Sequence, residues 1–146
     1  MTDRPLPELR AAYPHFGVIT SRWMDNDIYG HINNVHYYSF FDTVVNGYLM
    51  AQGVLVPEES PVIGLVVETR CNYFESIAFP DEVHAGLRVA RIGGSSVCYE
   101  IGLFRGDGAH AAAQGHFVHV YVDRATRRPV TLPESLQRAL KPLVVA

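Results

Sequence analysis

Between residues 62 and 123 the chain consists of long β-prone runs separated by glycine-rich turns. In the run 82–92 apolar residues fall at alternate positions, which is the spacing of a strand with one buried face. Gly93-Gly94 then marks a hairpin turn. The expected strands are 62–74, 82–92, 95–105 and 110–123. Because consecutive strands joined by tight turns pair with one another, this part of the chain predicts an antiparallel sheet.

The segment 33–52 precedes these strands and predicts one long helix. It contains no proline and a single glycine. Apolar residues recur there at three- and four-residue spacing, at Val35, Tyr38, Phe41, Val45, Tyr48 and Leu49. Further apolar residues widen this face, so the helix is expected to be mostly buried. Asn33 or Asn34 suits the N-cap position, and Gly53 suits the end of the helix.

Two shorter elements complete the expected α+β fold. A short strand is predicted over 16–23, and a C-terminal helix over 134–140. Thr131 and Glu134 have the spacing of a capping box that would open this last helix. The helix 33–52 must then cover one face of the sheet. Residues 1–15 are polar and proline-bearing, so we expect them to form a lead-in to one domain over 16–146.

Length and composition limit the classes of protein that the chain can belong to. With 146 residues, 48% of them hydrophobic, it is long enough for one globular domain with a sizeable core. A formal charge of −3 gives no general attraction for nucleic acid or anionic membranes. There is no apolar signal core at the N-terminus, and no run approaches the ~20 apolar residues that span a bilayer. A cytoplasmic protein without a membrane span is therefore expected.

The residues suited to chemistry are concentrated between the first strand and the long helix. This stretch holds the carboxylates Asp25 and Asp27, His31, and the amides Asn33 and Asn34. The first amides of a helix lack internal partners and carry partial positive charge, so they can stabilise an oxyanion. A nearby carboxylate can deprotonate water or attack a carbonyl directly. Because Asp and Asn are also common in turns, these residues alone leave a structural role for Asp27 and His31 open.

The order of these residues resembles a known signature. The run Asp25-x-Asp27-x-x-Gly30-His31-x-Asn33-Asn34-x-x-Tyr37 resembles that of the 4-hydroxybenzoyl-CoA thioesterase-like family of hot-dog-fold acyl-CoA thioesterases. Weaker likenesses follow in the family's order at 79–83, at the hairpin 91–96 and at 129–140. Together they extend over roughly residues 16–141.

This resemblance implies a single hot-dog fold, in which a five-stranded antiparallel sheet wraps around the helix 33–52. It implies a homodimer or homotetramer with active sites at the subunit interface. Asp27 would be the base or nucleophile in hydrolysis of an acyl-CoA thioester, and the backbone N–H of Asn34 would polarise the thioester carbonyl. His31 would either position the substrate or fix the loop. Asp25 is expected to hold the loop or to pair with Arg22.

Substrate contacts are expected from Tyr29, Gly30 and Asn33 of the same loop, although Asn33 also suits a helix cap. In relatives the 91–96 hairpin lies near the CoA nucleotide, so the resemblance makes Arg91 and Ser95 expected phosphate contacts.

No catalytic metal is expected. His116 and His119 are three residues apart in a predicted strand, so they face opposite sides of the sheet. No cofactor is expected, because the resemblance implies coenzyme A only as part of the substrate.

Two rival functions remain open at this point: a hot-dog dehydratase or hydratase acting on acyl thioesters, and an acyl-CoA binding module without turnover. The sequence does not decide the acyl group, or whether the carrier is CoA or an acyl-carrier protein.

Overall fold

The structure, a computed structural model, describes residues 5–145, so residues 1–4 of the predicted lead-in lie outside the described residues. Its strands and α-helices are β1 (His15–Thr20), α1 (Val35–Ala51), β2 (Val62–Tyr73), β3 (Glu82–Ile92), β4 (Ser96–Arg105), β5 (Ala113–Asp123) and α2 (Glu134–Leu140). Three short 3₁₀ turns accompany them, η1 (Arg10–Ala12), η2 (Trp23–Asp25) and η3 (Lys141–Leu143).

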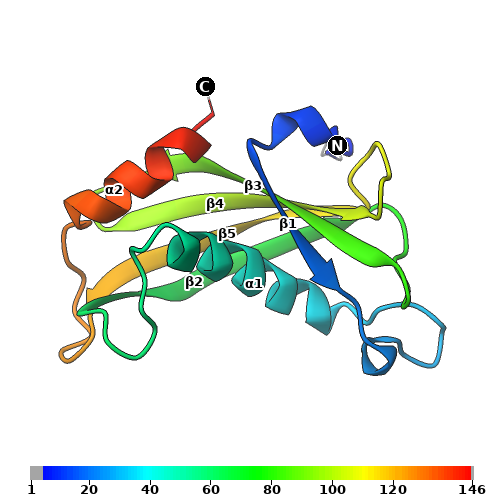
Figure 1. Ribbon diagram of the computed structural model, residues 1–146, viewed down its shortest axis with the longest axis horizontal. Helices are drawn as coiled ribbons and strands as arrows, with labels where there is room; N and C mark the ends of the chain where they lie inside the picture. The colour runs from blue at the N-terminus through cyan, green and yellow to red at the C-terminus, as the bar shows by residue number, and fades with distance from the viewer. Residues whose placement is uncertain (1–4, 146) are drawn as a thin grey trace, which may run out of the picture.

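The strands form one five-stranded sheet in the order β1-β3-β4-β5-β2, and every neighbouring pair is antiparallel. The sheet curves around α1, which lies along its inner face (Figure 1). The N-terminal end of α1 lies near the end of β1, whereas α2 lies at the opposite end of the molecule (Figure 1). The predicted α+β class, with a five-stranded antiparallel sheet, one long helix and a short C-terminal helix, is confirmed.

The core lies between α1 and the inner face of the sheet. The alternating apolar residues predicted for β3 and β4 are all fully buried there: Val83, Ala85, Leu87, Val89, Val97, Tyr99, Ile101 and Leu103. On the facing side α1 contributes several aromatic residues, and Phe41 packs edge-to-face against Phe117 of β5. The period-2 pattern of the strands and the wide apolar face of the helix therefore meet in one core.

The ends of α1 follow from side chains near the predicted caps. The helix begins at Val35, whose N–H donates to the side-chain oxygen of Asn33 at 3.1 Å. At its other end Gly53 has φ +74°, a left-handed conformation that glycine adopts without strain. The capping box predicted at Thr131 is wrong: α2 has Pro133 at its N-cap position and no side-chain cap.

β1 and β5 are shorter than predicted at one end, because the chain there turns away from the sheet or bonds to other segments. β1 ends at Thr20 rather than residue 23, since the chain turns into η2 after Arg22. β5 begins at Ala113 rather than residue 110. The residues just before it bond to other segments: Ala111 donates to the carbonyl of Glu8, and the carbonyl of Ala112 accepts from the end of β2.

The chain before β1 packs against the outer face of the sheet. Tyr13 is buried there, and its ring lies against Gly86 and Gly102, which are paired across β3 and β4. A Cβ at Gly102 would come within 2.6 Å of this ring, so the close approach requires glycine. Arg88 on the same face forms an ion pair with Glu8 at 2.7 Å.

Among the helices of residues 5–145, none combines the length and the apolar character that a membrane crossing requires.

Candidate active site

The loop between β1 and α1 is built around the buried carboxylate of Asp25. This carboxylate accepts hydrogen bonds from the Arg22 backbone N–H at 2.8 Å and from the guanidinium Nε and Nη2 at 3.0 and 2.8 Å. Burial by itself would raise the pKa of Asp25, but the bonds from Arg22 outweigh it and hold that pKa below its usual value. The predicted pairing of Asp25 with Arg22 is confirmed.

A second segment, the connection between β2 and β3, fixes the position of this loop. The N–H of Ile32 donates to the carbonyl of Ile77 at 2.8 Å. The side-chain oxygen of Asn26 accepts from the N–H of Phe79 at 3.0 Å. These bonds close the loop against the end of β2 and place Asp27 at the edge of a cavity between the two segments.

Both carboxylate oxygens of Asp27 are oriented by hydrogen bonds. Oδ1 accepts from the N–H of Tyr29 at 2.9 Å, and Oδ2 accepts from the side-chain amide of Asn33 at 3.2 Å. The side chain of Asp27 remains 19% exposed, so water can reach it. Gly30, at φ +85°, donates its N–H to the Asp27 carbonyl and closes the turn. A fixed and accessible carboxylate is suited to act as a general base or a nucleophile.

His31 and Asn33 lie beside this carboxylate in different roles. The Nδ1 atom of His31 is 4.0 Å from Oδ2 of Asp27 and 3.3 Å from the carbonyl oxygen of Ile32. Its ring is 43% exposed and lies nearly parallel to that of Tyr29. Asn33 caps α1 through its oxygen while its amide holds Asp27. Asn34 holds the N-cap position without a side-chain bond, so the capping oxygen comes from Asn33 one residue earlier, and the same side chain also orients the carboxylate.

The backbone amides at the start of α1 leave one donor unused. The neighbouring amides are engaged: Ile32 donates to Ile77, Asn33 to Asp25, and Val35 and His36 to Asn33. Within residues 5–145, no hydrogen-bond partner is found for the N–H of Asn34, and Asn34 lines the same cavity as Asp27. An unengaged N–H at a helix start is suited to bind a carbonyl oxygen on which negative charge develops.

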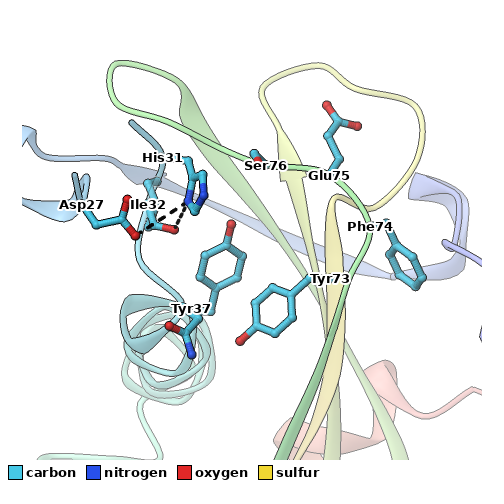
Figure 2. A pocket seen from close by; sticks show the side chains of 9 residues that line it. Asp27, His31, Ile32, Tyr37, Tyr73, Phe74, Glu75 and Ser76 are labelled. Atoms are coloured by element: carbon cyan, nitrogen blue, oxygen red, sulfur yellow. Dashed lines mark hydrogen bonds and ion pairs between the residues drawn. The ribbon is translucent and has the colours of Figure 1, made fainter. Parts of the chain in front are cut away.

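The cavity has a volume of about 370 Å³. Figure 2 shows Asp27 and His31 on one side and Tyr73, Phe74, Glu75 and Ser76 on the other, and Ile32, Asn34 and Tyr37 complete the lining. The rings of Tyr37 and Tyr73 meet edge-to-face, with their centroids 5.0 Å apart. The cavity therefore joins a polar end at Asp27 to aromatic walls, an arrangement suited to a ligand with a reactive polar group and an apolar body.

The predicted site residues do not all lie at this cavity. Asp27, His31 and Asn34 are together, whereas Tyr29, Gly30 and Asn33 line an open hollow of about 670 Å³ on the other side of Asp27.

Arg91 and Ser95 lie at the far end of β3. At about 3.3 Å per residue, Arg91 is about 30 Å along this strand from its first residue, Glu82, which pairs with Thr20 before the Asp27 loop. Within one chain these two residues are thus remote from Asp27, and their contact with CoA stays a prediction.

Four residues of the cavity were missed by reasoning from sequence: Tyr73, Phe74, Glu75 and Ser76. They lie more than 40 positions from Asp27, and only the pairing of the strands brings them close.

Comparisons with known proteins identify the family and the fold of the chain. A model of the thioesterase-like superfamily matches residues 21–140. The crystal structure of the PA5185 protein from Pseudomonas aeruginosa PAO1 is 52% identical, covers 97% of this chain and 99% of that chain, and has a TM-score of 0.94. The PA2801 protein of the same species, named as a candidate thioesterase, is 26% identical over 87% of this chain and 98% of its own, with a TM-score of 0.79.

A curated relative is more distant. The uncharacterised protein YsmA of Bacillus subtilis strain 168 is 23% identical over 95 residues. This match spans 65% of the present chain and 64% of YsmA, so the chain covers less than two thirds of that protein. The structural likenesses confirm the predicted hot-dog fold.

Proposed function

The chain belongs to the thioesterase-like superfamily, and we propose that it hydrolyses an acyl-CoA thioester to a free acid and CoA. One observation carries this proposal: the oriented carboxylate of Asp27 and the unengaged N–H of Asn34 share a cavity. The first supplies a base or nucleophile, and the second supplies a donor for the carbonyl oxygen. Membership of the narrower 4-hydroxybenzoyl-CoA thioesterase-like family is part of the same proposal.

In the proposed reaction the thioester carbonyl oxygen accepts a hydrogen bond from the N–H of Asn34. Asp27 takes a proton from a water molecule as that water attacks the carbonyl carbon, or its own oxygen attacks that carbon. In the first route the tetrahedral intermediate collapses and expels CoA as its thiolate. The thiolate takes up the proton that Asp27 removed from water, and the acyl group is released as the free acid. In the second route CoA leaves first, and water then hydrolyses the mixed anhydride formed with Asp27.

The residues around Asp27 support both routes by limiting its motion. Tyr29 and Asn33 each donate to one carboxylate oxygen, so the rotation of the carboxylate is fixed before substrate binds. His31, near Oδ2 and partly exposed, is placed to contact the substrate at the mouth of the cavity. Tyr29 and Gly30 border the outer hollow, where we assign the part of CoA next to the sulfur.

We further propose that the protein is a homodimer or homotetramer assembled through β2. Within residues 5–145 this strand pairs only with β5, so its other edge is open there, and Leu65, Val66 and Val67 on it are exposed. Arg91 and Ser95 are remote from the Asp27 of their own chain. In the proposed oligomer they would contact CoA that is bound at the Asp27 of a neighbouring copy. Light scattering is expected to give at least twice the 16.3 kDa chain mass. A monomeric mass would refute this part of the proposal.

Release of free thiol, followed with a chromogenic reagent, tests the function. The panel contains short, medium, long and aromatic acyl-CoAs and one acyl-carrier-protein thioester. We expect turnover on at least one acyl-CoA, with the aromatic or longer acyl groups preferred because aromatic side chains line the cavity. A 3-hydroxyacyl or enoyl thioester that changes its conjugated double bond without thiol release would indicate a dehydratase or hydratase. Tight binding without either reaction would indicate a binding module.

A further inference from the structure

A second cavity, also of about 370 Å³, lies along the C-terminal half of α1. Its lining residues are Asn46, Leu49, Leu55, Pro57, Ile63, Gly64, His119 and Tyr121. None of them lines the cavity that contains Asp27. From Asn34 to Asn46 the helix rises about 18 Å, at about 1.5 Å per residue, so the two cavities lie near opposite ends of α1.

His119 is the unusual residue of this cavity. It is 3% exposed, and its Nε2 atom has no hydrogen-bond partner within residues 5–145. Its ring is packed edge-to-face against Phe117 and Tyr99, with centroids 4.6 and 5.2 Å away. The imidazole is thus buried without its full set of hydrogen bonds, which is unfavourable, and a ligand that bonds to the ring would offset part of that cost.

The neighbouring strand β2 packs closely against the His119 ring. Gly64 of β2 is paired with Tyr121 and also lines the cavity. A Cβ at Gly64 would come within 2.8 Å of His119 Nδ1 and 3.0 Å of the Tyr121 ring. The ring therefore occupies the place that a side chain at residue 64 would take, and a methyl group there would displace the ring from the wall of the cavity.

The chemistry of the lining defines the ligand. None of the eight lining residues carries an acidic or basic side chain other than the imidazole of His119, and burial lowers the pKa of that imidazole to about 4, so it is neutral at pH 7. Leucine, proline and isoleucine side chains form the walls. A neutral imidazole has one donor and one acceptor nitrogen, and a hydroxyl group can satisfy either one, whichever tautomer is present.

We propose that this cavity binds an uncharged apolar group that carries one hydroxyl, with His119 as the hydrogen-bond partner of that hydroxyl. Two sources have this chemistry: a free alcohol or phenol, and the hydroxylated end of a long acyl thioester. The second source rests on the proposed function, because the acyl chain would have to extend from Asp27 along α1.

The first experiment measures binding and needs no turnover. 4-Ethylphenol and its methyl ether, 4-ethylanisole, are titrated into protein with ¹³C-labelled histidine, and the His119 resonance is identified by its loss in His119→Phe. We expect 4-ethylphenol to shift this resonance saturably and to bind at least about tenfold more tightly than the ether. Gly64→Ala is expected to abolish the shift, whereas Gly94→Ala, where a Cβ would meet nothing within 4 Å, retains it. An unchanged His119 resonance, or equal affinity for the ether, would overturn the proposal.

The second experiment separates the two sources. KM is measured for a long-chain ω-hydroxyacyl-CoA and for the unsubstituted acyl-CoA of equal length, in the wild type and in His119→Phe. If the wild type prefers the hydroxylated substrate and the variant does not, the acyl chain is the ligand. If the two substrates have equal KM values in the wild type and also in the variant, while 4-ethylphenol still binds the wild type, the ligand is a free alcohol or phenol. Because the first experiment is independent of hydrolysis, failure of the proposed function leaves its result interpretable.

Discussion

The two carboxylates of the β1–α1 loop are expected to respond differently to the same substitution, and Asp25→Asn is the sharper test of the structure. Asp25 is fully buried and accepts three hydrogen bonds from Arg22. In asparagine one carboxylate oxygen is kept and the other is replaced by an NH2 group, which cannot accept a hydrogen bond from Arg22. With that oxygen in the place of Oδ1, the bond from the Arg22 backbone N–H is lost and the two guanidinium bonds lose their charged acceptor; a charge-assisted bond is worth about 1.5–3 kcal/mol. Arg22 is 58% exposed and regains water, so the net loss is about 3 kcal/mol.

For a chain of this size, this loss corresponds to a fall in Tm of about 6–12 °C at pH 7. The pKa of Asp25 is lowered in the folded protein, so its contribution to stability is complete above the ordinary value of 3.8 and is lost as the pH falls through the folded pKa. The difference in Tm between wild type and variant should therefore be constant from pH 5 to 8 and shrink below pH 3.8. Circular dichroism melts at pH 7 and at pH 3 measure both. A variant that melts within 2 °C of the wild type at pH 7 would refute the structural role of Asp25.

Three further substitutions test other parts of the molecule. Gly102→Ala forces a methyl group onto the Tyr13 ring and should destabilise the fold by about 1–3 kcal/mol in urea denaturation, whereas Gly94→Ala, in open space, should change stability by less than about 0.5 kcal/mol. Asn33→Ala removes a helix cap and one constraint on the Asp27 carboxylate, so it should cost about 1 kcal/mol and, under the proposed mechanism, lower kcat more than it changes KM. His119 has a folded pKa of about 4 against 6.5, so its burial should cost the fold about 3 kcal/mol as the pH falls from 6.5 to 4. The flanking Tyr99 and Tyr121 do not titrate there, and His119→Phe should abolish this loss; an unchanged acid profile would contradict it.

Much of the fold could be predicted because its patterns are local. The period-2 alternation of 82–92 predicted the bounds of β3 correctly. The helix predicted over 134–140 also has the bounds of α2. The ends of β1 and β5 could not be read in the same way, since distant or side-chain hydrogen bonds end these strands. The strand order, in which β1 pairs with β3 and β2 pairs with β5, depends on packing around α1 and has no local signal.

The candidate site likewise has one part with a local sequence pattern and one part without. Asp27, His31 and Asn34 could be predicted together because they lie within eight residues of one loop. The other wall, Tyr73 to Ser76, carries no signature of its own and is brought to Asp27 only by long-range pairing. The unsatisfied imidazole of His119 is also invisible in the sequence, because burial of its Nε2 and the close approach of its ring to Gly64 are properties of the packed sheet.

The proposed catalytic role of Asp27 is tested most directly by Asp27→Asn, assayed on the best acyl-CoA of the thiol-release panel. Asp42→Asn serves as the matched control, since Asp42 lies on the exposed face of α1 and does not line the Asp27 cavity. We predict that kcat falls by about 10²–10⁴ in Asp27→Asn, with KM within a few-fold and Tm within about 3 °C of the wild type, while the control retains wild-type turnover. Near-normal turnover by a folded Asp27→Asn protein would contradict the account.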